Sequence, residues 1–160
     1  MLKRFNIILE KYLYAGTAVS SILFFLIVIL SVMGRYLRMP VLTSIELSRL
    51  FFVWSCFLAA ALTYRRRAHV GFTLLVEKMP GRVRYYTNQF VLLIIMAFLI
   101  ITLYHAITVT VLLWPTDLPM LGQSQSWFML PVPLVCAIMA SFTLEFIRDA
   151  HDLYKIGSKA

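Results

Sequence analysis

The chain has 160 residues, of which 61% are hydrophobic and only 14% are charged. A water-soluble domain of this length needs a larger share of charged residues on its surface. The composition therefore excludes a water-soluble domain and predicts an integral membrane protein. The net charge of +8 does not indicate nucleic-acid binding, because the basic residues lie between apolar blocks, as they do in the cytoplasmic loops of membrane proteins.

The first predicted elements are a surface helix and a membrane span. Residues 1–11 alternate apolar and charged residues at helical spacing, which predicts a short amphipathic helix at the membrane surface. Residues 12–34 contain no charge and would form a helix roughly 34 Å long, enough to cross a bilayer. No small-residue cleavage site accompanies them, so we expect a permanent span rather than a removable signal peptide.

The second span is predicted at about residues 44–64. Thr43 and Glu46 have the T-x-x-E spacing of a capping box, which predicts that the helix begins here. Its uncharged part, residues 50–64, is short for a membrane crossing. The span therefore has to include Glu46 and Arg49 near its outer end.

Two further spans follow a basic connection. Within residues 65–84, the apolar spacing over 70–79 fits a second surface helix. The third span is predicted at 86–113 and the fourth at 127–146, with two prolines in its first turns, where a missing N–H does least harm. We therefore expect an all-α fold: one polytopic membrane domain over residues 1–160, with four transmembrane helices and short interfacial amphipathic helices.

The distribution of Lys and Arg predicts the orientation. The two termini and the 65–84 connection carry twelve of them, and the other two connections carry three. Because Lys and Arg collect on the cytoplasmic side, both termini are predicted to be cytoplasmic. The three exceptions, Arg35, Arg38 and Arg49, are then on the opposite side.

Four charged residues are expected to gather at that outer side: Arg35, Arg38, Glu46 and Arg49. Glu46 and Arg49 are one helical turn apart and could pair. One interpretation is a structural ion cluster that caps the second helix and ties it to the first. The other is a docking or ion-pathway site, because ionisable residues near a span often mark function.

A second basic group follows the second span and comprises Arg65, Arg66, Arg67 and His69. We interpret it as a topology signal that also contacts anionic lipid headgroups. Within the span, a face of small residues allows another helix to approach closely. The residues predicted to pack against a helix of a partner subunit are Trp54, Ala59, Ala60 and Ala61.

Little in the chain predicts chemistry. His105 lies in the third span, where an interhelical hydrogen bond explains it; haem ligation would need a second axial ligand, and no other His lies in a span. Cys56 and Cys136 are isolated in apolar runs and form no metal or redox motif. No catalytic constellation is present, so we predict that the chain is not an enzyme and binds no metal.

Several short motifs occur in a fixed order: R-Y, a Pro, E-x-x-R, F-x-W-x-x-F-L-x-A-A, an Arg followed by a His, and a fourth span preceded by Pro and Trp and opened by a Pro. This order resembles the DctQ-like small membrane subunit of TRAP (tripartite ATP-independent periplasmic) transporters over nearly the whole chain. The family often has Gly at Ala59 and an acid at Thr73. The matching residues are Arg35, Tyr36, Pro40, Glu46, Arg49, Phe52, Trp54, Phe57, Leu58, Ala60, Ala61, Arg65, His69, Pro119, Trp127, Leu130 and Pro131.

The resemblance implies a three-part importer in the bacterial inner membrane. A periplasmic binding protein would capture an organic acid, such as a C4-dicarboxylate or a sialic acid, and a large membrane subunit would import it with a sodium gradient. The small subunit would be a scaffold with no cofactor of its own, because sodium coupling is expected in the large subunit. Its expected partners are these two proteins and anionic lipids, with no nucleic acid.

Two alternatives from other classes remain open from the sequence. One is a redox or haem-linked membrane anchor, which would need paired periplasmic cysteines or a second axial ligand. The other is a small homo-oligomeric exporter, which would place its acidic residue inside an early span rather than near a helix end.

Overall fold

The computed structural model describes the backbone of residues 2–37, 43–66 and 81–157, and the side chains of residues 6–37, 43–66 and 86–149. Within these residues, four stretches are long and apolar enough to cross a membrane. This confirms the predicted all-α class with four transmembrane helices. The described helices are α1 (Leu2–Tyr36), α2 (Thr43–Arg65), α4 (Gly81–Leu112), α5 (Ser126–Met129) and α6 (Pro131–Gly157).

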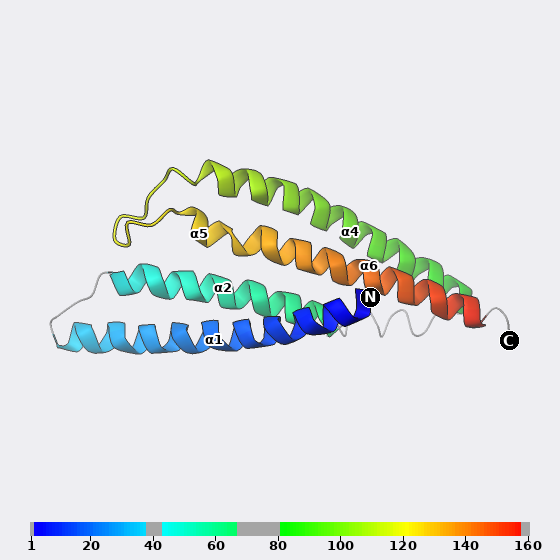
Figure 1. Cartoon of the computed structure of the whole chain (residues 1–160), viewed down its shortest axis with the longest axis horizontal. Helices are drawn as coiled ribbons and strands as arrows, with labels where there is room; N and C mark the ends of the chain where they lie inside the picture. Colours follow the sequence, from blue (N-terminus) through cyan, green and yellow to red (C-terminus); the bar gives the residue numbers. More distant parts are fainter. Residues whose placement is uncertain (1, 38–42, 67–80, 158–160) are drawn as a thin grey trace.

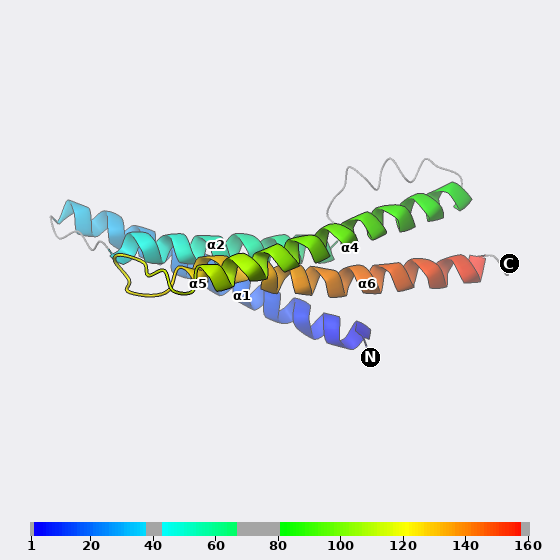
Figure 2. The same cartoon turned by 90° about the horizontal axis from the view of Figure 1, so that it is seen from above.

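The helices form an open row rather than a closed bundle. α1 packs along α2, α2 packs against α6, and α6 packs against α4 (Figure 1). Among the described residues, α4 touches neither α1 nor α2. Seen from above, α1 and α4 tilt in opposite directions across the two middle helices, so the row is twisted (Figure 2). α1 and α4 therefore form the two edges of the row, each with a broad outward face.

α6 is the most enclosed of the four spans. In its most apolar stretch 39% of the residues are buried, against 6% in α1, 17% in α2 and 11% in α4. Lipid tails are as apolar as a protein core, so the outward faces of the other helices remain hydrophobic without being buried. The core residues are Leu13, Leu58, Ala61, Tyr64, Leu92, Val135, Phe142 and Phe146.

The first helix differs from the prediction. The separate surface helix expected over residues 1–11 is continuous with the first span, and α1 runs unbroken for 35 residues. No proline interrupts it, and its buried Asn6 is bonded to α6. At about 1.5 Å per residue, α1 is roughly 52 Å long, well beyond the ~30 Å of bilayer hydrocarbon. It must therefore tilt or extend beyond the membrane. The surface helix expected over 70–79 lies outside the described residues.

The fourth span is divided by a proline. α5 ends at Met129, and α6 begins at Pro131. Proline has no N–H and its ring disturbs the preceding turn, which explains the break. α6 then continues to Gly157, eleven residues beyond the predicted end at 146.

Candidate functional site

A buried ion pair joins α2 to α6 at the end of the row where α1 begins and α6 ends. The Arg65 guanidinium donates from Nη1 to Glu145 Oε2 at 2.9 Å and from Nη2 to Oε1 at 3.2 Å. The two side chains are only 13% and 7% exposed. Such two-bonded Arg–carboxylate pairs combine charge attraction with fixed geometry, so this pair sets how α2 and α6 meet.

The same site also includes α1. The Asn6 amide donates to Glu145 Oε2, and Ser141 Oγ donates to Asn6 Oδ1 at 3.3 Å. Arg65 Nε lies 3.4 Å from Glu10 Oε2. We call Asn6, Glu10, Arg65 and Glu145 the Arg65 cluster. It connects three helices through contacts between residues 55 to 139 positions apart in sequence.

Aromatic rings cover the Arg65 guanidinium. The Arg65 guanidinium carbon lies 5.1 Å from the Phe142 ring centre and 5.7 Å from that of Phe146. Beside it, the Tyr64 and Thr143 hydroxyls are 2.7 Å apart. In apolar surroundings a charge that loses its partner has little water to replace it, so each member depends on the others.

This site corrects one sequence interpretation. Arg65, predicted to contact lipid headgroups, is instead held inside the protein by Glu145. Arg66 is 59% exposed, 4.0 Å from Glu10, and is accessible to headgroups. Arg67 and His69 lie outside the described residues. Sequence reasoning missed Asn6, Glu10 and Glu145; the available signal was that both acids fall on the same predicted side of the membrane as Arg65.

At the opposite end of the row, Glu46 binds the loop between α4 and α5. Its carboxylate oxygens accept the Met120 N–H at 3.2 and 3.3 Å and the Leu121 N–H at 2.8 Å. The loop turns tightly at Gly122, which has a left-handed φ of 62°. Glu46 therefore fastens the loop to α2, a tertiary role that its capping-box spacing did not predict.

The expected outer charged cluster is only partly visible. Arg35 and Arg49 are both exposed, and in the part of the chain that the structure describes no ion pair joins Glu46 to either. Arg38 lies outside the described residues. The predicted pairing of Glu46 with Arg49 is therefore not found, because Glu46 is occupied by backbone N–H groups of the loop. Whether these arginines dock a partner stays a prediction.

Trp54 supports the broken fourth span. Its indole Nε1 donates to the Trp127 carbonyl at 3.2 Å. In a continuous helix that carbonyl would accept the N–H of the residue four positions later, but that residue is Pro131, which has none. Trp54 thus satisfies the acceptor that Pro131 leaves without a backbone donor. This one contact explains two residues of the sequence motifs, Trp54 in the second span and Pro131 in the fourth.

This contact can be tested with a double-mutant cycle. Trp54→Phe is expected to lower the free energy of unfolding by about 1 kcal/mol, because the Trp127 carbonyl loses its protein donor. In a Pro131→Ala background the loss should be smaller, since the substituted alanine restores a backbone N–H. Detergent unfolding followed by tryptophan fluorescence measures all four proteins. Equal losses in both backgrounds would contradict this explanation.

Some of the small residues of α2 are buried in this chain and others are exposed. Ala61 is 0% exposed in the core of this chain, so it has no surface left for a partner. Ala60 is exposed and Ala59 half-buried. On the facing helix, an added Cβ at Gly16 would lie 3.4 Å from Leu58 Cδ1, an already tight contact. The small residues therefore serve partly to bring α1 and α2 together. Of the four residues predicted to pack against a partner, Trp54, Ala59 and Ala60 keep some exposed surface, and their contact with a partner stays a prediction.

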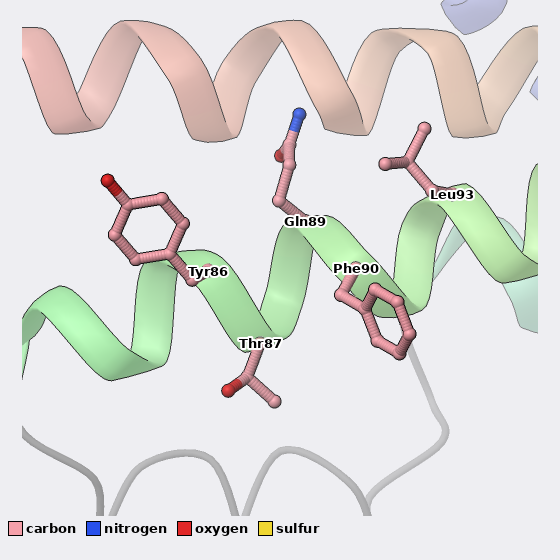
Figure 3. Close-up of a pocket in the computed structure, with 5 residues that line it drawn as sticks. All are labelled: Tyr86, Thr87, Gln89, Phe90 and Leu93. Carbon is pink, nitrogen blue, oxygen red and sulfur yellow. The ribbon is translucent and has the colours of Figure 1, made fainter.

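A hollow along the first turns of α4 is lined by Tyr86, Thr87, Gln89, Phe90 and Leu93, none of them charged (Figure 3). The Gln89 side chain is directed toward α6, and its Oε1 is buried without a hydrogen-bond partner in the described part of the chain. Within the same residues, no three His, Cys, Asp or Glu side chains come together to hold a metal.

Comparison with known proteins identifies the family of the chain. Residues 24–151 match the family described as tripartite ATP-independent periplasmic transporters, DctQ component. The chain is also 29% identical over 151 residues to the sialic acid TRAP transporter permease protein SiaT of Haemophilus influenzae (strain 86-028NP). The match covers 93% of this chain but only 23% of that relative. The chain belongs to the DctQ component family of the tripartite ATP-independent periplasmic transporters.

Proposed function

We propose that this chain is the small membrane subunit of a sodium-driven TRAP importer of an organic acid and acts as a scaffold for the large transport subunit. The family match over residues 24–151 carries the proposal. A sialic-acid-like compound or a C4-dicarboxylate is the proposed substrate class; the relative's name supports the former. On this proposal, the large subunit would correspond to the part of this relative that lies beyond the match. The chain itself is proposed to have no catalytic activity and no cofactor.

The structure supports a scaffold rather than a substrate path. Residues 12–34, 50–64, 86–112 and 127–144 contain no Asp, Glu, Lys or Arg. A transported carboxylate needs a cation or a broken helix end near the membrane midplane, and sodium needs oxygen ligands there. The fixed charges instead fasten the helices at the two ends of the row. A frame of this kind can stay still while transport elements of a neighbouring subunit move.

The proposed orientation places both termini and the Arg65 cluster on the cytoplasmic side of the bacterial inner membrane. Glu46 and the exposed Arg35 and Arg49 are then periplasmic. This follows from the Lys and Arg distribution. It also leaves positive charge on the side from which a periplasmic binding protein would approach, and Arg66 where anionic headgroups are found.

The proposal predicts recovery of a complex. The tagged chain, purified in mild detergent from membranes that also contain the large subunit, should retain one much larger polytopic protein, identified by mass spectrometry. Liposomes containing this complex should accumulate sialic acid or succinate only with the binding protein and an inward sodium gradient. Potassium in place of sodium is the control. Recovery of the chain alone, as a homo-oligomer that transports by itself, would overturn the proposal in favour of a small exporter.

A further inference from the structure

The outward side of α4 carries polar groups inside an otherwise apolar span. Residues three, four and seven apart share one side of a helix. We define the outer face of α4 as Ala97, Ile101, Tyr104, His105 and Thr108, all exposed, with Ile101 at 59% and Tyr104 at 69%. α4 is an edge helix and packs only on α5 and α6 among the described elements. This face therefore has no partner helix within the described chain.

His105 lies at hydrocarbon depth. The apolar span of α4 runs from Tyr86 to Leu112, and His105 is six residues, about 9 Å, from its midpoint. The hydrocarbon of a bilayer extends ~15 Å either side of its centre, so the imidazole is within it even if the helix shifts by several residues.

The His105 ring has no polar partner among the described residues. It makes an edge contact with the Tyr104 ring, 5.4 Å between centres and 76° between planes. The nearby Thr108 hydroxyl is satisfied, since it donates to the Tyr104 carbonyl at 3.0 Å. Ionisable residues within spans nearly always face protein or a water-filled cavity, because lipid offers no hydrogen bonds. Lipid alone is a poor cover for this face.

The opposite edge of the row provides a contrast. On α1, the outward residues Ile22, Phe25 and Ile29 are 59%, 63% and 54% exposed and wholly apolar. The Thr17 hydroxyl of α1 is satisfied by the Leu13 carbonyl at 2.7 Å. Lipid tails suit this edge. The two edges thus differ in chemistry: the outer face of α4 presents an imidazole, whereas these residues of α1 present only hydrocarbon.

We propose that the outer face of α4 docks a membrane helix of the large transport subunit, which supplies the hydrogen-bond partner of His105. This rests on the proposed function. The Haemophilus relative carries the matched segment in a polypeptide of which it is only 23%, so much more protein of the same system is available beside it. Ala97, the small residue of the face, allows a helix to approach closely.

Site-specific photo-crosslinking tests the surface. Benzoylphenylalanine replaces Ile101 on α4 or Ile22 on α1, which are matched at 59% exposure. In membranes that contain the whole transporter, the probe at position 101 should crosslink to the large subunit, and the probe at 22 should not. No product at 101, a product with a second copy of this chain, or a large-subunit product from 22 alone would overturn the proposal. Failure of the unsubstituted chain to co-purify with the large subunit would instead refute the proposed function.

Substitution tests the role of His105 itself. His105→Leu is expected to weaken retention of the large subunit about tenfold, and His105→Gln, which keeps an amide donor, should restore most of it. Thermal unfolding of the isolated subunit should be unchanged in both variants, because His105 bonds to no other described residue. Full retention in His105→Leu would overturn the proposed bond.

Discussion

Replacing Glu145 with alanine is expected to lower the free energy of unfolding of the subunit by about 3 kcal/mol or more. Glu145 is 5% exposed and accepts bonds from Arg65 and Asn6. Its removal leaves the Arg65 charge among the Phe142 and Phe146 rings, with only the longer contact to Glu10. Unfolding in mixed micelles titrated with sodium dodecyl sulfate, followed by tryptophan fluorescence, measures the loss.

Two further variants make the result specific. Arg66→Ala removes an exposed charge 4.0 Å from Glu10 and should cost no more than about 1 kcal/mol. The double change Arg65→Leu and Glu145→Leu should be less destabilising than Glu145→Ala, since the buried charge is removed together with its partner. If Glu145→Ala cost no more than Arg66→Ala, the Arg65 cluster would not be what fastens α2 to α6.

Glu46→Ala is expected to release the loop between α4 and α5. The carboxylate accepts the N–H groups of Met120 and Leu121, and bonds to a charged acceptor are each worth about 1.5–3 kcal/mol. These amides should therefore exchange with solvent more than about tenfold faster, as measured by hydrogen–deuterium exchange of the peptide that covers 116–124. Glu46→Gln, which keeps one acceptor oxygen, should give an exchange rate between those of the unsubstituted chain and Glu46→Ala. Unchanged exchange in Glu46→Ala would contradict this role.

Comparing Glu46→Ala with Arg49→Ala separates the two interpretations of the outer charges. If the outer charges are purely structural, Glu46→Ala should change loop exchange and complex assembly, whereas Arg49→Ala, at an exposed position, should leave both unchanged. If the outer charges also dock the binding protein, Arg49→Ala should lower the affinity of the complex for that protein without altering loop exchange. Unchanged affinity in both variants would dispose of the docking interpretation.

The spans were predictable because their cause is local. Bilayer thickness sets the length of an apolar helix, and that length can be counted along the chain. The tertiary contacts were not predictable in this way. Helical spacing favoured Arg49, one turn away, as the partner of Glu46, but the groups it binds lie 74 and 75 residues later. Likewise, the basic run after α2 was interpreted as one group, although Arg65 turns inward to Glu145 while Arg66 stays exposed.

The motifs were visible in the sequence, but their physical reason was not. Trp54 lies midway along the second span and Pro131 in the first turns of the fourth, and only the folded arrangement shows that one donates to the carbonyl that the other cannot serve. The continuity of α1 was also missed, because charged residues over 1–11 indicated a surface helix. Asn6 and Glu10 instead contact the other helices, and these contacts stabilise the segment as a continuation of the first span.

α6 lies between two helices that are synthesised before it. α1 and α2 can pair as soon as both are in the membrane, but α2 and α4 make no direct contact among the described residues. Before α6 is inserted, α4 therefore has no direct contact with α1 or α2 within the part of the chain that the structure describes. Arg65 likewise has no ion-pair partner on α6, because Glu145 is synthesised 80 residues later. The row as described therefore forms only once α6 is present, and a chain halted before α6 would leave α4 without its main packing partner.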